Sequence, residues 1–548
     1  MRILSFSTYH DSSVCAINNG YIEFFCKEER LTGVKRDSLP FKSLDLYSSL
    51  NLGKIDYIAS HIAEGDDTFK NIFRAYIRKK FNLPMINFLY ESHHKCHASL
   101  AFYNSGFKTC LVFVVDRKGS ALYINNQAVA SEAESVFKCS YPDYITPIYK
   151  AYSSAENLIP RKLDIYRHLQ SVCPGVDVKV HDYLGIVKVY EAATTLIDQH
   201  PLENGKTMGL SSYGEDINYE KLFADGSPIS TYFSLTDNKY SKDVVCFNDL
   251  HHLANLNITK NDYQLYANKA KQVQIETQDE VLNLIQKYVN LSGINNVCIV
   301  GGYGLNVIAN NHYIKNLPGV NFYFEPLSDD TGLAIGAAMF KYRLESKDNN
   351  IIPLKDTFYH YYNTEDITGG SKTSLEELTD ILISQNSLGI FEGAPEAGPR
   401  ALGHRSILFD PRNPLSKDIV NKIKKREWYR PFAAVVLKDK IEEYFESNKH
   451  VDYSFMTVGL NIKVSKKDII PGVTHVDGSC RVQTVSEGFL YDLLIEFYKK
   501  TGCPVLLNTS LNLAGSPLAQ TKNDALSVFY NSDLNAMYFV DDNKIFKK

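Results

Sequence analysis

Residues 296–306 read NVCIVGGYGLN, a short apolar run that leads directly into a glycine-rich turn. The first five residues have the length and composition of a buried strand, and the glycines after them allow a tight turn into a helix over 305–310. Before this stretch, residues 262–292 carry apolar side chains at helical spacing, and Gly293 ends that pattern. After it, residues 332–340 are rich in Ala and Gly and predict a buried helix. This order of strand, glycine turn and helix predicts an α/β fold.

More strands are expected nearer the N-terminus. Residues 2–7 predict a strand, a polar loop follows, and a second strand starts at Val14. The turn signal Asn18-Asn19-Gly20 separates it from a third strand over 21–26. A further strand, Cys110–Val115, ends abruptly in a polar segment. We therefore expect a meander at the start of the chain.

A polar segment over residues 343–375 is the best candidate for a domain boundary. Beyond it, a helix over 375–385 and a strand over 389–391 begin a second α/β pattern. The sequence therefore predicts two α/β domains.

Composition narrows the class of protein. The chain has 548 residues, 44% hydrophobic and 22% charged, which excludes a disordered or fibrous chain. A net charge of −4 excludes a global polycation, so nucleic acid would have to bind a local basic surface. Ten cysteines without a CxxC pair favour free thiols. No apolar run is long enough to span a bilayer, and the N-terminus lacks the apolar core of a signal peptide. We expect a cytoplasmic protein without membrane contact.

Residues 91–97, ESHHKCH, hold the sharpest cluster of candidate ligands. On a helix, His93 and His97 point the same way and offer two ligands to a divalent metal. Asp116, at the end of the strand that follows, is a candidate third ligand. Imidazole and carboxylate donors suit Fe(II), Zn or Mn. The alternative is a pair of histidines that lines a core without metal.

The glycine turn at 301–306 and the segment SDDTG at 328–332 form a second cluster. Backbone N–H groups in such a turn can approach a phosphate or a ribose. The pattern is not that of a P-loop, and a turn used only for packing explains it equally well.

The third cluster combines basic and hydroxyl side chains of the C-terminal part with Gly and Pro turns. Arginine and lysine in such surroundings are typical of phosphate recognition, although solvated surface charges are the simpler explanation for any one of them. The cluster consists of the segments GPRALGHRS (398–406) and NTS (508–510) and the single residues Lys424, Arg426, Arg430 and Arg481. The basic, aromatic stretches 73–81 and 149–168 suit a nucleic-acid backbone or an ordinary surface.

Read in order, these segments resemble the O-carbamoyltransferase family, which includes the nodulation-factor, tobramycin and cephamycin carbamoyltransferases. The resemblance covers nearly the whole chain. It rests on ILSFSTYHDSS, KEERLTGVK, HHKCHASLAFYNSGF, VDRKG, GKTMGLSSYG, GGYGLN, SDDTGLAIGAA, GPRALGHRSILFDPR, KKREWYRPFA, VTHVDGSCRVQTV and PVLLNTSLN.

The resemblance implies an α/β fold of two parts. Residues 1–355 would form an ASKHA-type domain of two ribonuclease-H-like lobes, and residues 356–548 a YrdC-like α/β domain. In the YrdC-like domain, carbamoyl phosphate would react with ATP, which carries Mg, to give carbamoyl adenylate. In the first, an acceptor hydroxyl would take the carbamoyl group and release AMP.

The resemblance also assigns roles to residues of this sequence. The resemblance implies that the metal, expected to be Fe(II), is bound by His93, His97, Asp116 and Asp330. The wall around the adenine and ribose would be formed by Gly301, Gly302 and Asn306. The pocket for carbamoyl phosphate and ATP would be formed by Arg400, Lys424, Arg430, Arg481, Asn508 and Ser510. His10 would lie nearest the transferring carbamoyl group. Arg117-Lys118 departs from the small residues usual in the family, which puts the shape of the acceptor mouth in doubt.

The acceptor is left open. It is either a small alcohol or sugar, or a hydroxymethylated pyrimidine in DNA or RNA, in which case Arg117-Lys118 would line a backbone track. Two rival functions are threonylcarbamoyl transfer to tRNA and a non-catalytic, ATP-binding regulator. The oligomeric state is also open, with a homodimer as one option.

Overall fold

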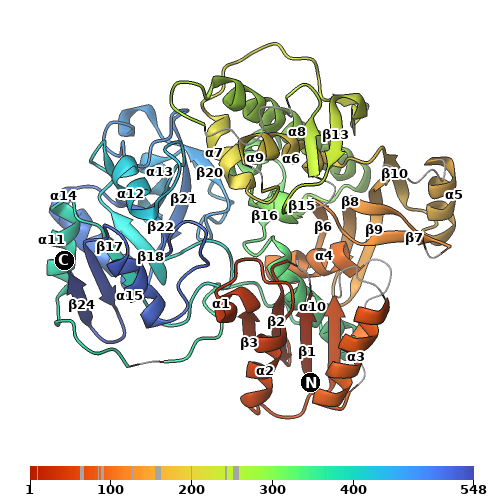
Figure 1. The fold of residues 1–548 in the computed structure, drawn as a ribbon, viewed down its shortest axis with the longest axis horizontal. Helices are drawn as coiled ribbons and strands as arrows, with labels where there is room; N and C mark the ends of the chain where they lie inside the picture. The colour runs from red at the N-terminus through yellow and green to blue at the C-terminus, as the bar shows by residue number, and fades with distance from the viewer. Residues whose placement is uncertain are drawn as a thin grey trace. The chain divides into compact units, whose positions relative to one another are not determined.

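The computed structural model describes residues 1–8, 10–61, 67–83, 85–87, 92–125, 127–154, 162–198, 200–240, 244–250, 258–364 and 366–548. Helices and strands alternate along most of this length (Figure 1), which confirms the predicted mixed α/β fold. Glu91 of the histidine cluster and residues 155–161 of the basic stretch 149–168 lie outside the described residues.

A five-stranded sheet near the N-terminus has the order β3-β2-β1-β4-β5. Its strands are β1 (Arg2–Ser7), β2 (Ser13–Asn18), β3 (Tyr21–Lys27), β4 (Tyr57–His61) and β5 (Met85–Asn87). β2 and β3 pair antiparallel, and Asn19 and Gly20 between them have φ of 50° and 86°, as a tight hairpin turn requires. The predicted strands at 2–7 and 21–26 are confirmed to within one residue.

A seven-stranded sheet has the order β10-β9-β8-β6-β15-β16, with β7 paired to β8. Its strands are β6 (Thr109–Val115), β7 (Ala121–Ile124), β8 (Gln127–Ser140), β9 (Tyr144–Ser154), β10 (Asp177–His181), β15 (Asn296–Val300) and β16 (Asn321–Phe324). β15 lies parallel to both β6 and β16. Strands in such a position are covered on both faces, which explains why residues 297–300 are uniformly apolar.

The helices that accompany these sheets are α1 (Glu28–Thr32), α2 (Phe41–Ser49), α3 (Asp67–Phe81), α4 (Ser92–Ser105), α5 (Lys162–Val172), α6 (Ile186–Ile197), α7 (Asn204–Ser211), α8 (Gln264–Ser292), α9 (Val307–Asn316) and α10 (Leu333–Ser346). The helix predicted from residue 305 begins at Val307. The delay arises because Gly302–Leu305 form a 3₁₀ turn and the Asn306 side chain caps α9 by accepting the Ala309 N–H at 3.1 Å.

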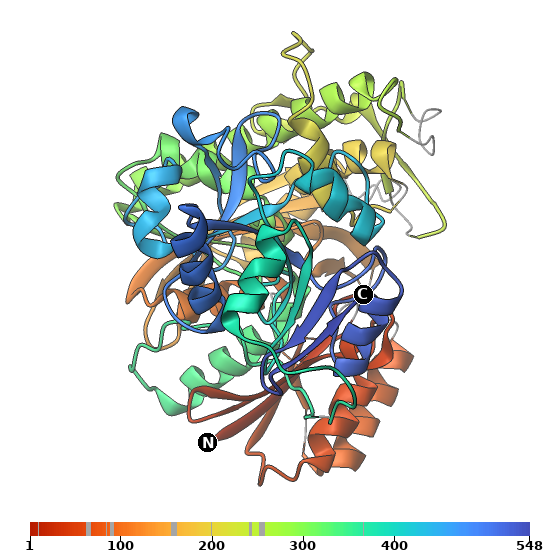
Figure 2. The ribbon, with the colours of Figure 1, turned by 90° about the vertical axis from the view of Figure 1, so that its left-hand side faces the viewer.

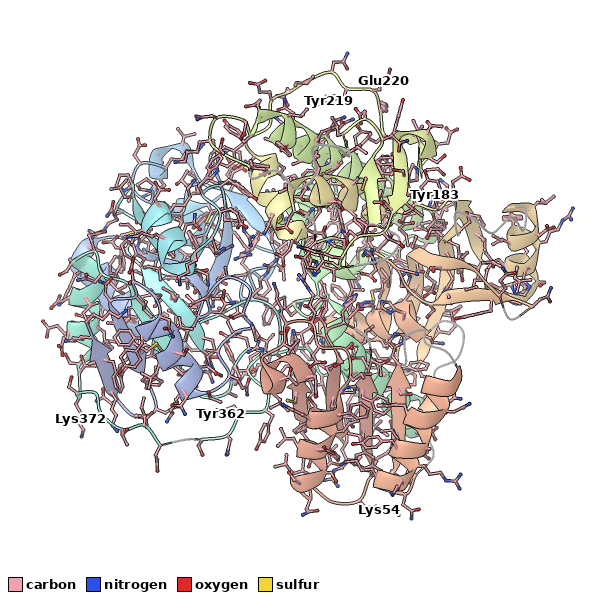
Figure 3. All side chains as sticks on the ribbon, in the orientation of Figure 1. Lys54, Tyr183, Tyr219, Glu220, Tyr362 and Lys372 are labelled. Carbon is pink, nitrogen blue, oxygen red and sulfur yellow. The ribbon has the colours of Figure 1, made fainter. Side chains whose placement is uncertain are left out.

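Two small hairpins lie in the same part of the chain: β11 (Phe223–Ala224) with β12 (Ser227–Pro228), and β13 (Phe233–Thr236) with β14 (Val244–Phe247). The Tyr183 hydroxyl (Figure 3) lies 2.7 Å from the carbonyl oxygens of both Ser230 and Phe233, so its single O–H can donate to either, and it ties the second hairpin to the segment before α6.

An eight-stranded mixed sheet forms the C-terminal part, in the order β20-β21-β19-β22-β18-β17-β23-β24. Its strands are β17 (Leu388–Phe391), β18 (Arg405–Phe409), β19 (Ala433–Leu437), β20 (Gly459–Asn461), β21 (Ser479–Val485), β22 (Val505–Ser510), β23 (Ala536–Phe539) and β24 (Lys544–Lys547). Its helices are α11 (Leu375–Ile383), α12 (Ser416–Lys424), α13 (Ile441–Tyr444), α14 (Phe489–Thr501) and α15 (Lys522–Tyr530). The end of the chain lies at the edge strand β24 (Figure 2).

The chain divides into two compact units. One comprises Met1–Ser5 and Ile55–Leu354, and the other comprises Phe6–Lys54 and Lys355–Lys548. Residues 6–54 group with the C-terminal part, whereas the sequence-based division placed them in the first domain. In the part of the chain that the structure describes, every helix is too short or too polar to cross a membrane.

Candidate functional site

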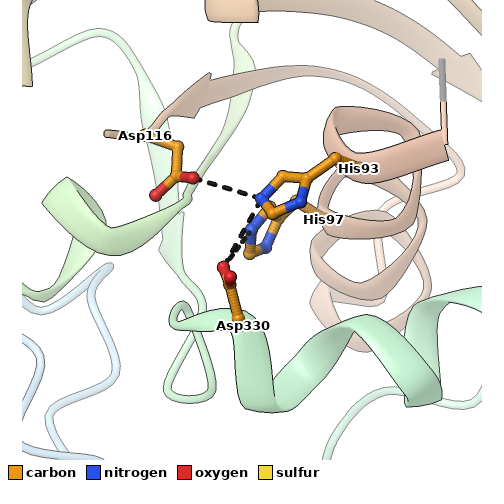
Figure 4. Close-up of side chains that lie close together, drawn as sticks. All are labelled: His93, His97, Asp116 and Asp330. Atoms are coloured by element: carbon orange, nitrogen blue, oxygen red, sulfur yellow. Dashed lines mark hydrogen bonds and ion pairs between the residues drawn. The ribbon is translucent and has the colours of Figure 1, made fainter. Parts of the chain in front are cut away.

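The four residues expected to bind metal lie together in the first unit (Figure 4). His93 and His97 come from the first turns of α4, Asp116 directly follows β6, and Asp330 opens the short 3₁₀ turn before α10. One potential ligand atom from each residue lies within 4.8 Å of the other three. All four side chains are buried.

The distances among these atoms fit a shared metal ion. His93 Nε2 is 3.1 Å from Asp116 Oδ2 and 3.4 Å from Asp330 Oδ1, and His97 Nε2 is also 3.4 Å from Asp330 Oδ1. Ligands about 2.1 Å from one ion lie roughly 3.0–3.4 Å from each other in octahedral or tetrahedral geometry. His97 is fully buried, yet neither of its ring nitrogens has a hydrogen-bond partner among the described residues. The donor set therefore fits a divalent cation.

Burial and the neighbouring charges act on the histidines of this cluster in opposite directions. Burial favours a neutral imidazole, but the carboxylates of Asp330 and Asp116 raise the pKa of His93 well above its ordinary value. A fifth residue, His61 at the end of β4, lies behind His93, with its Nε2 3.1 Å from His93 Nδ1. Burial and the neighbouring His93 lower the pKa of His61 to about 3. Sequence reasoning missed His61, because nothing in its local pattern points to a partner 32 residues away.

Two glycines allow α10 and the turn before it to pack closely against α4, which places Asp330 beside the histidines. A Cβ on Gly336 of α10 would lie 2.0 Å from the Cys96 carbonyl oxygen of α4, and one on Gly332 would lie 2.2 Å from Leu100 Cδ2. The two helices can pack this closely only because these positions lack side chains. Since Asp330 lies in the turn that leads directly into α10, the close packing sets its distance from α4.

The glycine turn after β15 contacts the same cluster. Gly301 has a φ of 91°, and a Cβ there would lie 2.5 Å from the Val115 carbonyl oxygen. The Gly302 N–H donates to Asp116 Oδ1 at 2.9 Å. Asn306, besides capping α9, exchanges hydrogen bonds with the Gln274 amide at 3.0 and 3.3 Å. The turn therefore orients Asp116, and the Asn306 side chain is occupied by protein contacts.

Arg117, beside Asp116, does not point freely to solvent. Its guanidinium forms a two-pronged ion pair with Glu191 of α6, which is 1% exposed. Glu191 also accepts hydrogen bonds from Lys188 Nζ at 3.3 Å and from the Val245 N–H of β14 at 2.9 Å. Arg117 is thus committed to an internal contact, which weakens the expectation that it lines a nucleic-acid track. Lys118 is exposed.

In the second unit, two residues expected in the anion pocket share one face of the sheet. Ala433 of β19 pairs with Arg481 on one side and with Asn508 on the other, so the side chains of this row point the same way. Asn508 donates to the Gln483 amide oxygen at 2.8 Å. Arg481 Nε and Asn508 Oδ1 are buried and have no hydrogen-bond partner among the described residues. These two atoms are a donor and an acceptor available to a ligand.

Positive charge is concentrated around this face. Burial and the neighbouring Arg400 and Arg430 lower the pKa of Arg481 well below its ordinary value. Burial, Arg426 and Arg430 do the same to the pKa of Lys424. Arg430 forms an ion pair with Glu427 at 3.5 Å. Cations that repel one another in a buried setting favour an anion between them.

Lys424, at the end of α12, is fully enclosed by neutral oxygens. Its ammonium contacts the carbonyl and hydroxyl oxygens of Ser510 and the carbonyl and side-chain oxygens of Asn512. An ammonium has three N–H donors, so these contacts use all of them. Lys424 and Ser510 therefore hold the loop after β22, and Lys424 contributes charge rather than a free donor.

His10 also belongs to the second unit. Its Nδ1 lies 3.3 Å from Asp11 Oδ2, and Asp11 Oδ1 lies 3.9 Å from Lys27 Nζ. Asp11 has a φ of 58°, a left-handed conformation that is uncommon outside glycine. The imidazole is partly exposed, next to a carboxylate that can orient it.

Two family models match parts of this chain. Residues 49–339 match a family model described as the carbamoyltransferase N-terminus, and residues 379–547 match one described as the carbamoyltransferase C-terminus.

Nodulation proteins are among the similar sequences. Nodulation protein NolNO of Sinorhizobium fredii is 26% identical over 577 residues, covering 96% of this chain and 78% of that protein. Nodulation protein U of Rhizobium tropici is 37% identical over 234 residues, covering 41% of this chain and 40% of that protein. An uncharacterized Synechocystis protein is 26% identical and covers 100% of this chain and 97% of its own length.

The similarity to solved structures is weaker than the similarity to these sequences. Full-length HypF in a phosphate- and nucleotide-bound form superposes with a TM-score of 0.38 at 14% identity. The match covers 63% of this chain and 56% of the HypF chain.

Proposed function

Since the chain belongs to the carbamoyltransferase family, we propose that it is an ATP-dependent O-carbamoyltransferase that uses carbamoyl phosphate and proceeds through carbamoyl adenylate. The family establishes a carbamoyltransferase enzyme. The nucleotide, the intermediate and the acceptor oxygen are the proposal.

The observation that carries the proposal is the cationic face of the C-terminal sheet. Arg481 presents a buried Nε without a partner among the described residues, and Arg400 and Arg430 lie near enough to lower its pKa. Such a site is unfavourable when empty and favourable around phosphate groups, which offer several acceptor oxygens and negative charge. Both carbamoyl phosphate and the triphosphate of ATP meet that need.

The first half-reaction is assigned to this face. Water cleaves carbamoyl phosphate to carbamate and phosphate, and a carbamate oxygen then attacks the α-phosphorus of ATP. A new P–O bond forms as the bond to pyrophosphate breaks. Arg400, Arg430 and Arg481 bind the phosphate oxygens and stabilise the negative charge of the leaving pyrophosphate. Lys424 and Ser510 hold the loop that borders them.

The second half-reaction forms the carbamate ester. The acceptor hydroxyl attacks the carbamoyl carbon, the bond to AMP breaks, and the hydroxyl proton passes to a base. We assign that base to His10, whose Nδ1 faces Asp11 and whose other nitrogen can take the proton. The four-residue cluster His93, His97, Asp116 and Asp330 would hold a divalent metal, expected to be Fe(II), which when bound polarises a carbonyl or phosphoryl oxygen.

The strand orders support the ASKHA part of the proposal. The first sheet runs in the order third, second, first, fourth and fifth strand. In the second sheet the path β9-β8-β6-β15-β16 repeats that order, and β7 and β10 are additional strands. Two ribonuclease-H-like lobes would produce such a repeat. Gly301 and Gly302 lie at the turn after β15, where we place the adenine and ribose of the nucleotide. For residues after 355 we retain a YrdC-like domain.

We propose a small-molecule alcohol or sugar as the acceptor. Nodulation proteins are among the relatives, and the Arg117 guanidinium is engaged by Glu191 rather than available to a phosphate backbone. A hydroxymethylated pyrimidine in DNA is the competing outcome of the acceptor test.

The test separates the two half-reactions. Purified protein is incubated with ATP and carbamoyl phosphate, and pyrophosphate and AMP are measured with and without a panel of sugars, alcohols and hydroxymethylcytosine-containing DNA. We expect pyrophosphate to need carbamoyl phosphate, and AMP release to rise only with the right acceptor. Formation of ADP and phosphate instead would contradict an adenylate.

A His10→Ala variant tests the assigned base. We expect it to slow carbamoyl transfer by roughly 10²–10⁴-fold while carbamoyl-phosphate-dependent pyrophosphate release continues. Loss of both half-reactions would mean that His10 is structural, and transfer at the wild-type rate would remove it from the reaction.

A further inference from the structure

His61 contacts the candidate metal cluster without belonging to it. It is the last residue of β4, is 2% exposed, and its ring meets that of His93 edge to face, with centroids 4.9 Å apart. Its Nε2 lies 3.1 Å from His93 Nδ1, within hydrogen-bond distance. His93 turns its other nitrogen, Nε2, toward Asp116 and Asp330.

The two nitrogens of His93 therefore face different partners. A neutral imidazole that offers the Nε2 lone pair to a metal must carry its proton on Nδ1. That proton needs an acceptor, since a buried N–H without one is unfavourable. The lone pair of His61 Nε2 is placed to accept it.

We propose that His61 is a positioning residue of the metal centre: it accepts the His93 Nδ1–H and so fixes the tautomer and orientation in which His93 Nε2 faces the ion. This inference rests on the metal centre of the proposed function. It adds a residue that acts through a ligand and is not itself a ligand.

The charge balance of the cluster favours a neutral partner at this point. Asp116 and Asp330 together carry the two negative charges that neutralise a divalent cation. A carboxylate behind His93, the common arrangement in metal sites, would leave an excess negative charge in a buried place. An imidazole provides an acceptor without adding charge.

The backbone supports the same orientation of His93 and distinguishes it from His97. The His93 N–H donates to Ser120 Oγ at 3.2 Å, in the loop that follows Asp116. His93 is thus held at its backbone and at its ring. His97 Nδ1, by contrast, has no hydrogen-bond partner among the described residues.

The experiment measures metal affinity directly. Metal-free wild-type protein and the variants His61→Leu and His61→Gln are titrated with Co²⁺ alone, and affinity is followed by calorimetry and by the visible absorption of the bound ion. Circular dichroism and thermal unfolding check that each variant folds. The matched control is His181→Leu, which removes another buried histidine of the same unit, bonded to Ser227 Oγ rather than to a ligand.

We expect His61→Leu to weaken Co²⁺ binding about 10–100-fold, because leucine cannot accept the Nδ1–H. His61→Gln should recover most of that loss, since its amide oxygen can accept the same proton. His181→Leu should bind Co²⁺ as wild type does, even if it unfolds at a lower temperature.

Three results would overturn the inference. Wild-type affinity in a folded His61→Leu variant would refute His61 alone and leave the metal centre standing. Loss of one nitrogen ligand from the X-ray absorption spectrum of the loaded His61→Gln variant would make His61 a ligand instead. Absence of Co²⁺ binding to wild type would refute both this inference and the metal centre.

Discussion

Lys424 shows how a single buried cation can organise a site. Its ammonium is enclosed by oxygens of Ser510 and Asn512. Lys424→Met would remove the ammonium donor from these partly buried oxygens, of which Asn512 Oδ1 keeps the Ser510 hydroxyl as a donor, so we expect the free energy of unfolding to fall by about 1–3 kcal/mol. We also expect pyrophosphate release to fall.

Lys422→Met is the matched control for this change. Lys422 lies in the same helix but forms an exposed ion pair with Asp533, which contributes little to stability. If both variants have the same free energy of unfolding and both release pyrophosphate at the wild-type rate, Lys424 neither stabilises the loop nor supports the first half-reaction.

Glu325 makes the stability of the first unit depend on pH. Burial raises the pKa of its carboxyl group to about 7, although the Leu327 N–H, the Asn104 amide and the Tyr323 hydroxyl all donate to it. Between pH 4.5 and 7 the folded state keeps a proton that the unfolded state loses. Stability therefore falls as pH rises through this window, by about 3 kcal/mol at most, and the loss is constant above it.

The measurement compares unfolding of wild type and Glu325→Gln from pH 5 to pH 8. We expect the variant to gain stability relative to wild type as pH rises, since glutamine does not titrate. Parallel curves would show that the Glu325 carboxyl group has an ordinary pKa.

At the scale of elements, the packing of α10 on α4 sets the candidate metal cluster. Alanine is about 1 kcal/mol more favourable than glycine inside a helix, so propensity alone predicts that Gly336→Ala stabilises α10. The Cβ would, however, lie 2.0 Å from the Cys96 carbonyl oxygen. We expect the variant to lose about 1–3 kcal/mol of stability and to bind Co²⁺ more weakly, because α10 carries Asp330 away from α4.

Gly319→Ala is the control for this prediction, because the space around Gly319 is open. We expect it to change neither unfolding nor Co²⁺ affinity. Equal behaviour of the two variants would mean that the helices adjust without cost to the cluster.

At the scale of the whole molecule, local sequence patterns predicted the helices and strands well, but they predicted poorly which of these elements contact one another. The strands at 2–7 and 296–300 were predictable because turn residues bound a short apolar run. His93 and His97 were predictable as a pair because helical spacing is local. Asp330 came only from the family resemblance, since its approach depends on two helices packing through Gly336. His61 and Glu191 had no local signal, because each acts on a partner that the fold brings from far along the chain.

The stoichiometry of one reaction tests the proposed adenylate pathway most directly. The protein is supplied with ATP, carbon-labelled carbamoyl phosphate and the best acceptor from the panel, and labelled ester, AMP and pyrophosphate are counted together. We expect one AMP and one pyrophosphate for each labelled carbamate ester, with no ester when ATP is omitted. Labelled ester formed without ATP, or formed while ATP is cleaved to ADP, would contradict it.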